Sequence, residues 1–219
     1  MPQRQKTVAV LLARYGRTYA SELGIEIARN TPSPLFRLLC AALLFSARIS
    51  AEIALKAARA LAEKGWTTAA AMAGSGWEER TLTLNRAGYA RYDESTSRML
   101  GATAARLLDA YGGDLRRLRA AAREDPAEER RLLKEFKGIG DVGADIFFRE
   151  AQAAWDELYP FADQKALQSA LRLGLPGDAE GLARLVARED FPRLAAALVR
   201  VALAKAHGEI EALARGGNQ

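Results

Sequence analysis

The sequence predicts an all-α fold, and three observations indicate it. Apolar residues recur at the i, i+3, i+4 spacing of a helix face along most of the 219 residues. Ala, Leu, Arg and Glu, which favour helices, are abundant throughout the chain. No alternation of apolar and polar residues typical of a strand continues for a useful length. Because 49% of the residues are hydrophobic, we expect the helices to pack into a globule.

The first predicted helices surround one apolar segment. Ser33-Pro34 is typical of an N-cap followed by proline at the first helical position. Residues 35–47 are apolar on almost every side, so we expect them to form the buried central helix. Further helices are expected at residues 51–63, 67–73, 78–85 and 93–111, the last of them ended by Gly112-Gly113.

A second group of helices is expected in the rest of the chain. Asp125-Pro126, followed by Glu128, is typical of a capping box, and the helix that it starts should end at Phe136. The helices expected after it cover residues 141–155, 164–173, 179–188 and 192–214.

The charge and the cysteine content narrow the classes of function. Lys and Arg number 32 against 27 Asp and Glu, so the net charge is +5, which favours an anionic partner, nucleic acid above all. The single cysteine, Cys40, excludes an internal disulfide and a cysteine-ligated metal cluster. No apolar run reaches the roughly 18 residues that a membrane span needs. The N-terminus lacks the apolar core of a signal peptide, so we expect a cytoplasmic protein without a membrane partner.

Two segments contain the candidate binding and catalytic residues. Gly138-Ile139-Gly140 forms a turn between two helical runs, where bare backbone N–H groups and a helix N-terminus suit a phosphate. Lys137 precedes this turn and is a candidate phosphate contact. Asp163 begins a later helical run, a position that by itself is typical of an N-cap.

The pattern Leu133-x-x-Phe136-x-Gly138-Ile139-Gly140-x-x-x-Ala144, followed by Asp163, resembles the helix-hairpin-helix DNA glycosylases of the endonuclease III type. The resemblance implies a two-lobed helical fold with the active cleft between the lobes. It implies a middle lobe of six-helix type at 31–137 and a second lobe at 1–30 plus 138–219. The second lobe would carry the hairpin, at about 133–154, and the catalytic aspartate.

The same resemblance implies a function in base-excision repair. Such a glycosylase flips a damaged or mispaired base out of duplex DNA and hydrolyses its N-glycosidic bond. The family's essential aspartate, matched by Asp163, stabilises the positive charge that develops on the sugar. The implied partner is double-stranded DNA that contains a lesion, bound by a nucleoid-associated monomer.

Two loops are predicted to probe the duplex. Arg48, in the segment 46–50, lies where the family carries a gap-filling polar side chain. Tyr89, in the segment 88–92, matches the family's wedge position, and Arg91 beside it would hold a phosphate. The alternative for this second loop is a plain turn with an exposed arginine and partly buried tyrosines.

Departures from the family pattern place the chain in a divergent branch. Bifunctional members carry a nucleophilic lysine where this chain has Val142, so we expect a monofunctional enzyme in which water attacks. Lys137 and Lys165 remain alternatives as the amine of an AP lyase, and Lys165 is otherwise a phosphate contact. Gln168 replaces a usual arginine of the family. A non-catalytic helix-hairpin-helix DNA-binding protein is the other alternative.

The resemblance also bears on cofactors. The family's iron–sulfur cluster needs four closely spaced cysteines, and Cys40 is the chain's one cysteine, so we expect no such cluster and no metal at the active site. A structural monovalent cation at the hairpin backbone is the single ion that the resemblance allows.

Overall fold

The computed structural model describes residues 3–216 and contains no strand among them, which confirms the all-α prediction. The helices are α1 (Gln3–Tyr15), α2 (Tyr19–Glu22), α3 (Pro32–Ser46), α4 (Ala51–Glu63), α5 (Ala69–Gly74), α6 (Trp77–Leu84), α7 (Asp93–Tyr111), α8 (Leu115–Ala121), α9 (Pro126–Leu133), α10 (Asp141–Ala151), α11 (Gln164–Arg172), α12 (Ala179–Ala183), α13 (Phe191–Ala204) and α14 (His207–Gly216). Short 3-10 turns at Ile27–Arg29, Asp156–Leu158 and Arg188–Asp190, and a π-helical turn at Asn85–Tyr89, connect some of them.

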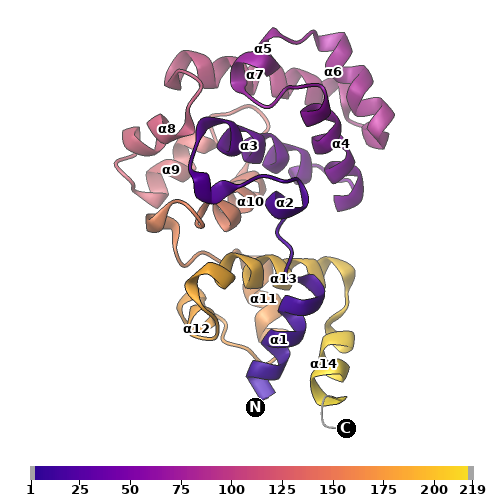
Figure 1. The fold of residues 1–219 in the computed structure, drawn as a ribbon, viewed down its shortest axis with the longest axis vertical. Helices are drawn as coiled ribbons and strands as arrows, with labels where there is room; N and C mark the ends of the chain where they lie inside the picture. The colour runs from indigo at the N-terminus through magenta and orange to yellow at the C-terminus, as the bar shows by residue number, and fades with distance from the viewer. Residues whose placement is uncertain (1–2, 217–219) are drawn as a thin grey trace.

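The helices form two groups, each around its own cluster of buried side chains (Figure 1). The larger cluster surrounds α3 and draws on α2, α4, α5, α7, α8 and α10. The smaller cluster joins α1 to α11, α12, α13 and α14, so both ends of the chain lie in the same group of helices. Apolar side chains removed from water around these two centres are the main stabilising force of the fold.

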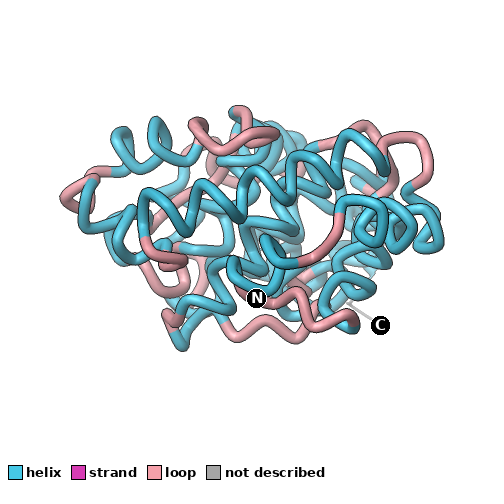
Figure 2. The backbone as a smooth tube through the Cα atoms, turned by 90° about the horizontal axis from the view of Figure 1, so that it is seen from above, coloured by secondary structure: helices cyan, strands magenta, loops and turns pink. Residues whose placement is uncertain are grey.

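Helix α10 connects the two groups because it packs on α3 on one side and on α13 on the other. The view from above shows helices joined by loops, with no strand among residues 3–216 (Figure 2). The hairpin turn lies directly before the amino end of α10, and the segment that leads to α11 follows its carboxyl end.

Several sequence-based boundaries are confirmed, and one cap is wrong. The predicted ranges 51–63 and 93–111 coincide with α4 and α7. The central helix starts two residues earlier than predicted because Pro32, not Pro34, takes the first turn after the N-cap Thr31. The Ser33 hydroxyl instead donates to the carbonyl oxygen of Thr67, at 2.9 Å.

The predicted helices in the second half are too long. The expected helix 192–214 is broken at Lys205, whose φ of 55° belongs to the left-handed region that ends a helix. Helices α10 and α12 end at Ala151 and Ala183, before the predicted residues 155 and 188. Helix α8 was not predicted, although Asp114 caps it by accepting from the Arg116 amide.

The larger buried cluster includes Ala20 to Ile27 and Ile139 to Leu158 along with the middle of the chain. The division at 31–137 against 1–30 plus 138–219 stays a prediction. No helix between residues 3 and 216 is long and apolar enough to cross a membrane.

Candidate active site

The two glycines of the hairpin turn differ in whether they leave room for a side chain. Gly138 has a φ of +94°, and a Cβ there would meet the Met99 sulfur at 2.7 Å. Gly140 is the N-cap of α10 in an extended conformation, and a Cβ there would have no neighbour within 4 Å. Ile139 between them is buried and anchors the turn, while both glycines are exposed.

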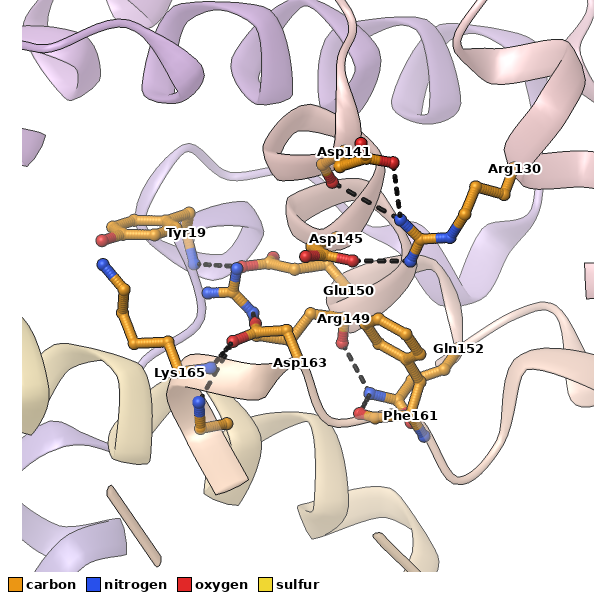
Figure 3. Close-up of polar contacts among 11 residues, drawn as sticks. Tyr19, Arg130, Asp141, Asp145, Arg149, Glu150, Gln152, Phe161, Asp163 and Lys165 are labelled. Carbon is orange, nitrogen blue, oxygen red and sulfur yellow. Dashed lines mark hydrogen bonds and ion pairs between the residues drawn. The ribbon is translucent and has the colours of Figure 1, made fainter. Parts of the chain in front are cut away.

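Acidic and basic side chains alternate around this turn. Lys134 Nζ lies 2.7 Å from Asp141 Oδ1, at the first residue of α10. Arg130 Nη2 lies 2.5 Å from Asp145 Oδ1, and its Nη1 reaches the Asp141 carbonyl oxygen at 3.5 Å (Figure 3). Lys137 is exposed. The basic groups of the turn are therefore largely matched by carboxylates of α10.

Asp163 is the N-cap of α11, as its sequence position predicts. Its Oδ1 accepts hydrogen bonds from the amides of Lys165, at 3.0 Å, and Ala166, at 3.1 Å. The segment before it is braced by Gln152, whose side chain donates to the Phe161 carbonyl and accepts from the Phe161 amide, each at 2.9 Å (Figure 3). Asp163 is only 7% exposed, so its carboxylate is fixed in place.

The second oxygen of Asp163 faces a buried arginine. Arg149 Nε lies 3.0 Å from Asp163 Oδ2, with the two side chains 4% and 6% exposed (Figure 3). Neither atom has a well-directed hydrogen bond, so the pair is held by charge. Beside it, Glu150 accepts from the amides of Tyr19, at 2.8 Å, and Ala20, at 2.7 Å. Burial raises the pKa of the Glu150 carboxyl, and these amides and Arg149 offset only part of the rise.

A cleft of about 720 Å³ opens beside this pair. Three walls come from the end of α3 with the start of α4, from one face of α10, and from α11 with α13. The lining residues are Tyr19, Phe45, Ser46, Ala47, Ile49, Ser50, Ala51, Val142, Asp145, Ile146, Arg149, Asp163, Gln164, Lys165, Gln168, Val199 and Leu203. This volume falls within the range that small-molecule ligands occupy in proteins.

One wall of the cleft is aromatic. The rings of Tyr19 and Phe45 stack at 4.0 Å between centroids, with an interplanar angle of 24°. The Arg200 guanidinium lies 4.3 Å from the centroid of the Tyr19 ring. Both rings are thus held by packing, and a flat ligand could contact them without their moving.

The structure brings some of the predicted site residues together and leaves others apart. Asp163, Lys165 and Gln168 line the cleft with Val142, which is 59% exposed. Arg48 is exposed between two lining residues of the cleft wall. The glycines of the hairpin and Lys137 lie outside the lining, on the turn that precedes α10.

The predicted wedge residue, Tyr89, lies in the core of the larger cluster. Its side chain is completely buried, and its hydroxyl donates to the Leu44 carbonyl oxygen at 2.8 Å. Burial raises the pKa of Tyr89 to about 12. Because the ring belongs to the core of the larger cluster, the wedge role would require this loop to open. Arg91 is exposed, with its guanidinium 5.3 Å from the centroid of the Tyr92 ring.

Sequence reasoning missed the residues that surround Asp163. Arg149 and Glu150 interrupt the apolar run of α10, and that interruption is a signal for a buried charge network. Tyr19 and Phe45 left no signal, because a tyrosine and a phenylalanine far apart in sequence are ordinary core residues.

No three His, Cys, Asp or Glu side chains between residues 3 and 216 are arranged to hold a metal ion. Cys40 is buried in α3, where burial raises the pKa of its thiol, and a single thiol does not fit a four-cysteine cluster. The hairpin carbonyls of Lys137 and Gly140 already accept from the Thr103 hydroxyl and the Ala144 amide. The monovalent cation at this backbone stays a prediction.

Comparisons with known proteins identify the fold. No protein-family model matches the chain, and no curated protein sequence matches it. A non-covalent endonuclease III–DNA complex matches with a TM-score of 0.56 and 18% identity, over 92% of this chain and 86% of that chain. Endonuclease III trapped as a covalent intermediate with DNA, in an estranged-adenine complex, matches with a TM-score of 0.50 and 20% identity, over 76% and 73%. At these identities the likeness concerns the fold, and residues 3–216 adopt the all-α fold of endonuclease III.

Proposed function

We propose that this protein is a DNA repair glycosylase that hydrolyses the N-glycosidic bond of a damaged or mispaired base flipped from duplex DNA. The observation that carries the proposal is the position of Asp163. A buried carboxylate, fixed by two amides of α11, lines a cleft of about 720 Å³ at the end of α10, the helix that the hairpin turn begins. The solved structures with this fold are endonuclease III bound to DNA.

The carboxylate would act on the sugar of the flipped nucleotide. When the bond between C1′ and the base nitrogen breaks, the electron pair leaves with the base and positive charge develops on the sugar. A fixed carboxylate stabilises that charge without reorganising, which is the role of carboxylates in glycoside hydrolysis. Water then adds to C1′, and its proton passes to the departing base or to solvent.

Hydrolysis is favoured over a lyase reaction by the residue at the start of α10. Val142 lines the cleft and has no lone pair with which to attack C1′. Between the two alternative amines, only Lys165 lines the cleft, so it replaces Lys137 as the residue that a lyase would use.

Duplex DNA would bind through the hairpin turn. Gly140 leaves the first amides of α10 uncovered for a phosphate, since no atom lies within 4 Å of the place where a Cβ would be. Arg48 at the mouth of the cleft is proposed to fill the gap in the duplex, and exposed Arg91 to contact the backbone. Lys165 is proposed to contact the phosphate of the flipped nucleotide.

One observation favours the second candidate, a DNA-binding protein without turnover. Both oxygens of Asp163 already have partners, Oδ1 in the helix cap and Oδ2 beside Arg149, and Oδ2 is buried without a hydrogen bond. A nucleotide that uses this carboxylate must therefore approach an oxygen that Arg149 covers.

A screen of the purified protein against duplexes that each carry one modified base tests the proposal. We expect release of the free base from at least one duplex without strand cleavage. Asp163→Asn should lower that turnover by orders of magnitude and retain DNA affinity, because the negative charge matters most in the transition state. Asn keeps the cap, but it leaves buried Arg149 uncompensated, so circular dichroism must verify the fold. Tight binding with no excision from any duplex would favour the second candidate.

A further inference from the structure

We propose that Arg149 is the positioning residue of the site: its guanidinium holds the Asp163 carboxylate in one orientation, an inference that rests on the proposed function of Asp163. The contact joins two helices, since Arg149 belongs to α10 and Asp163 caps α11.

The periodicity of α10 explains how Arg149 reaches this place. Val142, Asp145, Ile146 and Arg149 follow the i, i+3, i+4, i+7 pattern and line the same cleft. The helix thus carries the hairpin at its amino end and the partner of Asp163 near its carboxyl end. A phosphate docked on the hairpin and the carboxylate that acts on the sugar are fixed relative to each other by one rigid element.

The two oxygens of Asp163 have separate tasks. Oδ1 accepts the Lys165 and Ala166 amides, as any N-cap side chain does. Oδ2 takes no part in the cap and lies 3.0 Å from Arg149 Nε. A cap alone needs no arginine, so this contact has a different purpose from ending the helix.

Because the site is buried, the charge of Arg149 strongly affects the Asp163 carboxylate. A carboxylate with 6% side-chain exposure has lost most of its hydration, and a buried charge without a partner is costly. Arginine carries a permanent positive charge on a planar group of fixed shape. The guanidinium therefore replaces water as the partner of Oδ2 and favours one direction of the carboxylate.

The surrounding charges leave this task to Arg149. The charged or titratable groups that face Asp163 or its partner are Asp145 and Glu150 from α10, Lys165 from α11, Tyr19 from α2, and Arg200 from α13. Asp145 is paired with Arg130, Lys165 is exposed, and Arg200 is paired with Glu22 at 3.1 Å. Glu150 is occupied by the amides of Tyr19 and Ala20.

Crystal structures of Arg149 variants test this inference. In Arg149→Gln we expect the Asp163 carboxylate to turn away from the orientation that it has beside Arg149, while the cap of α11 is kept. Arg149→Lys should show a mixture of the two orientations, because the amine keeps the charge on a different stem. Arg200→Gln is the matched control: it removes a guanidinium near Glu150 and Tyr19 without touching Asp163, so the carboxylate should keep its orientation.

An unchanged carboxylate orientation in Arg149→Gln would overturn the proposal, and if that variant does not fold, an unchanged orientation in Arg149→Lys would do so. On an excised duplex, kcat should fall by about tenfold or more in Arg149→Gln with KM retained, and Arg149→Lys should recover part of the loss. A protein that excises no base fails the proposed function, whereas the orientation of the carboxylate still decides whether Arg149 positions Asp163.

Discussion

Lys134 Nζ lies 2.7 Å from Asp141 Oδ1, which puts an ion pair on the first residue of α10, directly after the hairpin turn. The hydrogen bond from Lys134 holds the pKa of the Asp141 carboxyl below its usual value, so this side chain is an anion at neutral pH. Asp141 thus supplies a negative charge at the helix N-terminus where a DNA phosphate would bind.

Replacing Asp141 by Asn should strengthen DNA binding. The change removes the repulsion of an incoming phosphate and frees Lys134, so we expect affinity for any duplex to rise by roughly tenfold at low salt, with a steeper salt dependence. Fluorescence anisotropy of a labelled duplex over a salt series measures both. Asp156→Asn is the control, since Asp156 is exposed and pairs with Arg188 in a 3-10 turn far along the chain from the hairpin. Unchanged affinity in Asp141→Asn would count against the hairpin as the phosphate site.

Alanine substitutions at the two hairpin glycines should affect different properties, DNA affinity at one and stability at the other. Gly140→Ala should fold like the parent and weaken binding to every duplex, because its Cβ meets no protein atom but would obstruct a phosphate. Gly138→Ala should lower the melting temperature, since its φ of +94° strains a side chain and its Cβ would collide with Met99. The strain amounts to about 1–2 kcal/mol. Thermal unfolding and anisotropy on both variants measure this.

Gly208→Ala gives the matched control for these variants. It lies in α14, and a Cβ there also has no neighbour within 4 Å. DNA affinity that falls as much in this control as in Gly140→Ala would show that the effect is not local to the hairpin.

The parts of the fold that sequence could predict are those governed by local rules. Helix α7 has the predicted bounds because Asp93 lies in its first turn and Gly112 takes the left-handed conformation after its last. The break between α13 and α14 escaped prediction because Lys205, an ordinary helix former, takes the left-handed conformation there. Tertiary packing decides such a position, and the sequence carries no local sign of it.

The candidate site also contains residues that local rules predict and residues that only tertiary packing determines. Asp163 and the hairpin were predictable because a cap and a two-glycine turn have spacing signatures. The partner Arg149 comes from another helix, and contacts across helices leave no periodic signal in one sequence. The wedge role of Tyr89 was predicted from its loop position, whereas its burial depends on packing against α3 and α4.

No Schiff base should accumulate when the protein meets abasic DNA under borohydride. We expect Val142 at the position of the lysine of the resembling bifunctional enzymes, and an aliphatic side chain cannot attack the sugar. Gel electrophoresis detects a trapped covalent complex as a shifted band. A strong band would remove the monofunctional assignment. Loss of that band in Lys165→Ala but not in Lys137→Ala would assign the lyase to the amine that lines the cleft.

Away from the cleft, a buried acid should make the stability depend on pH. Glu129 in α9 has no exposed surface, and its carboxylate oxygens meet no hydrogen-bond donor among the described residues when ionised. Burial raises the pKa of Glu129 to about 9, helped by the hydrogen bond that the protonated acid makes to Glu157. Arg119 holds Glu157 in place through hydrogen bonds of 2.5 and 2.6 Å.

Glu129→Gln should therefore stabilise the protein at alkaline pH. In the unfolded chain this carboxyl titrates at its ordinary pKa of about 4.5, so between that pH and about pH 9 folding takes up a proton. The stability that the protonated acid contributes is complete below the lower value and declines by about 1.4 kcal/mol per pH unit until the higher one. Glutamine keeps the donor to Glu157 and cannot ionise, so its advantage over the parent should grow from pH 5 to pH 8. Urea unfolding across that range measures the slope, with Glu128→Gln, on the exposed face of α9, as the control. A free energy of unfolding that runs parallel in parent and Glu129→Gln would mean that Glu129 is ionised in the folded protein.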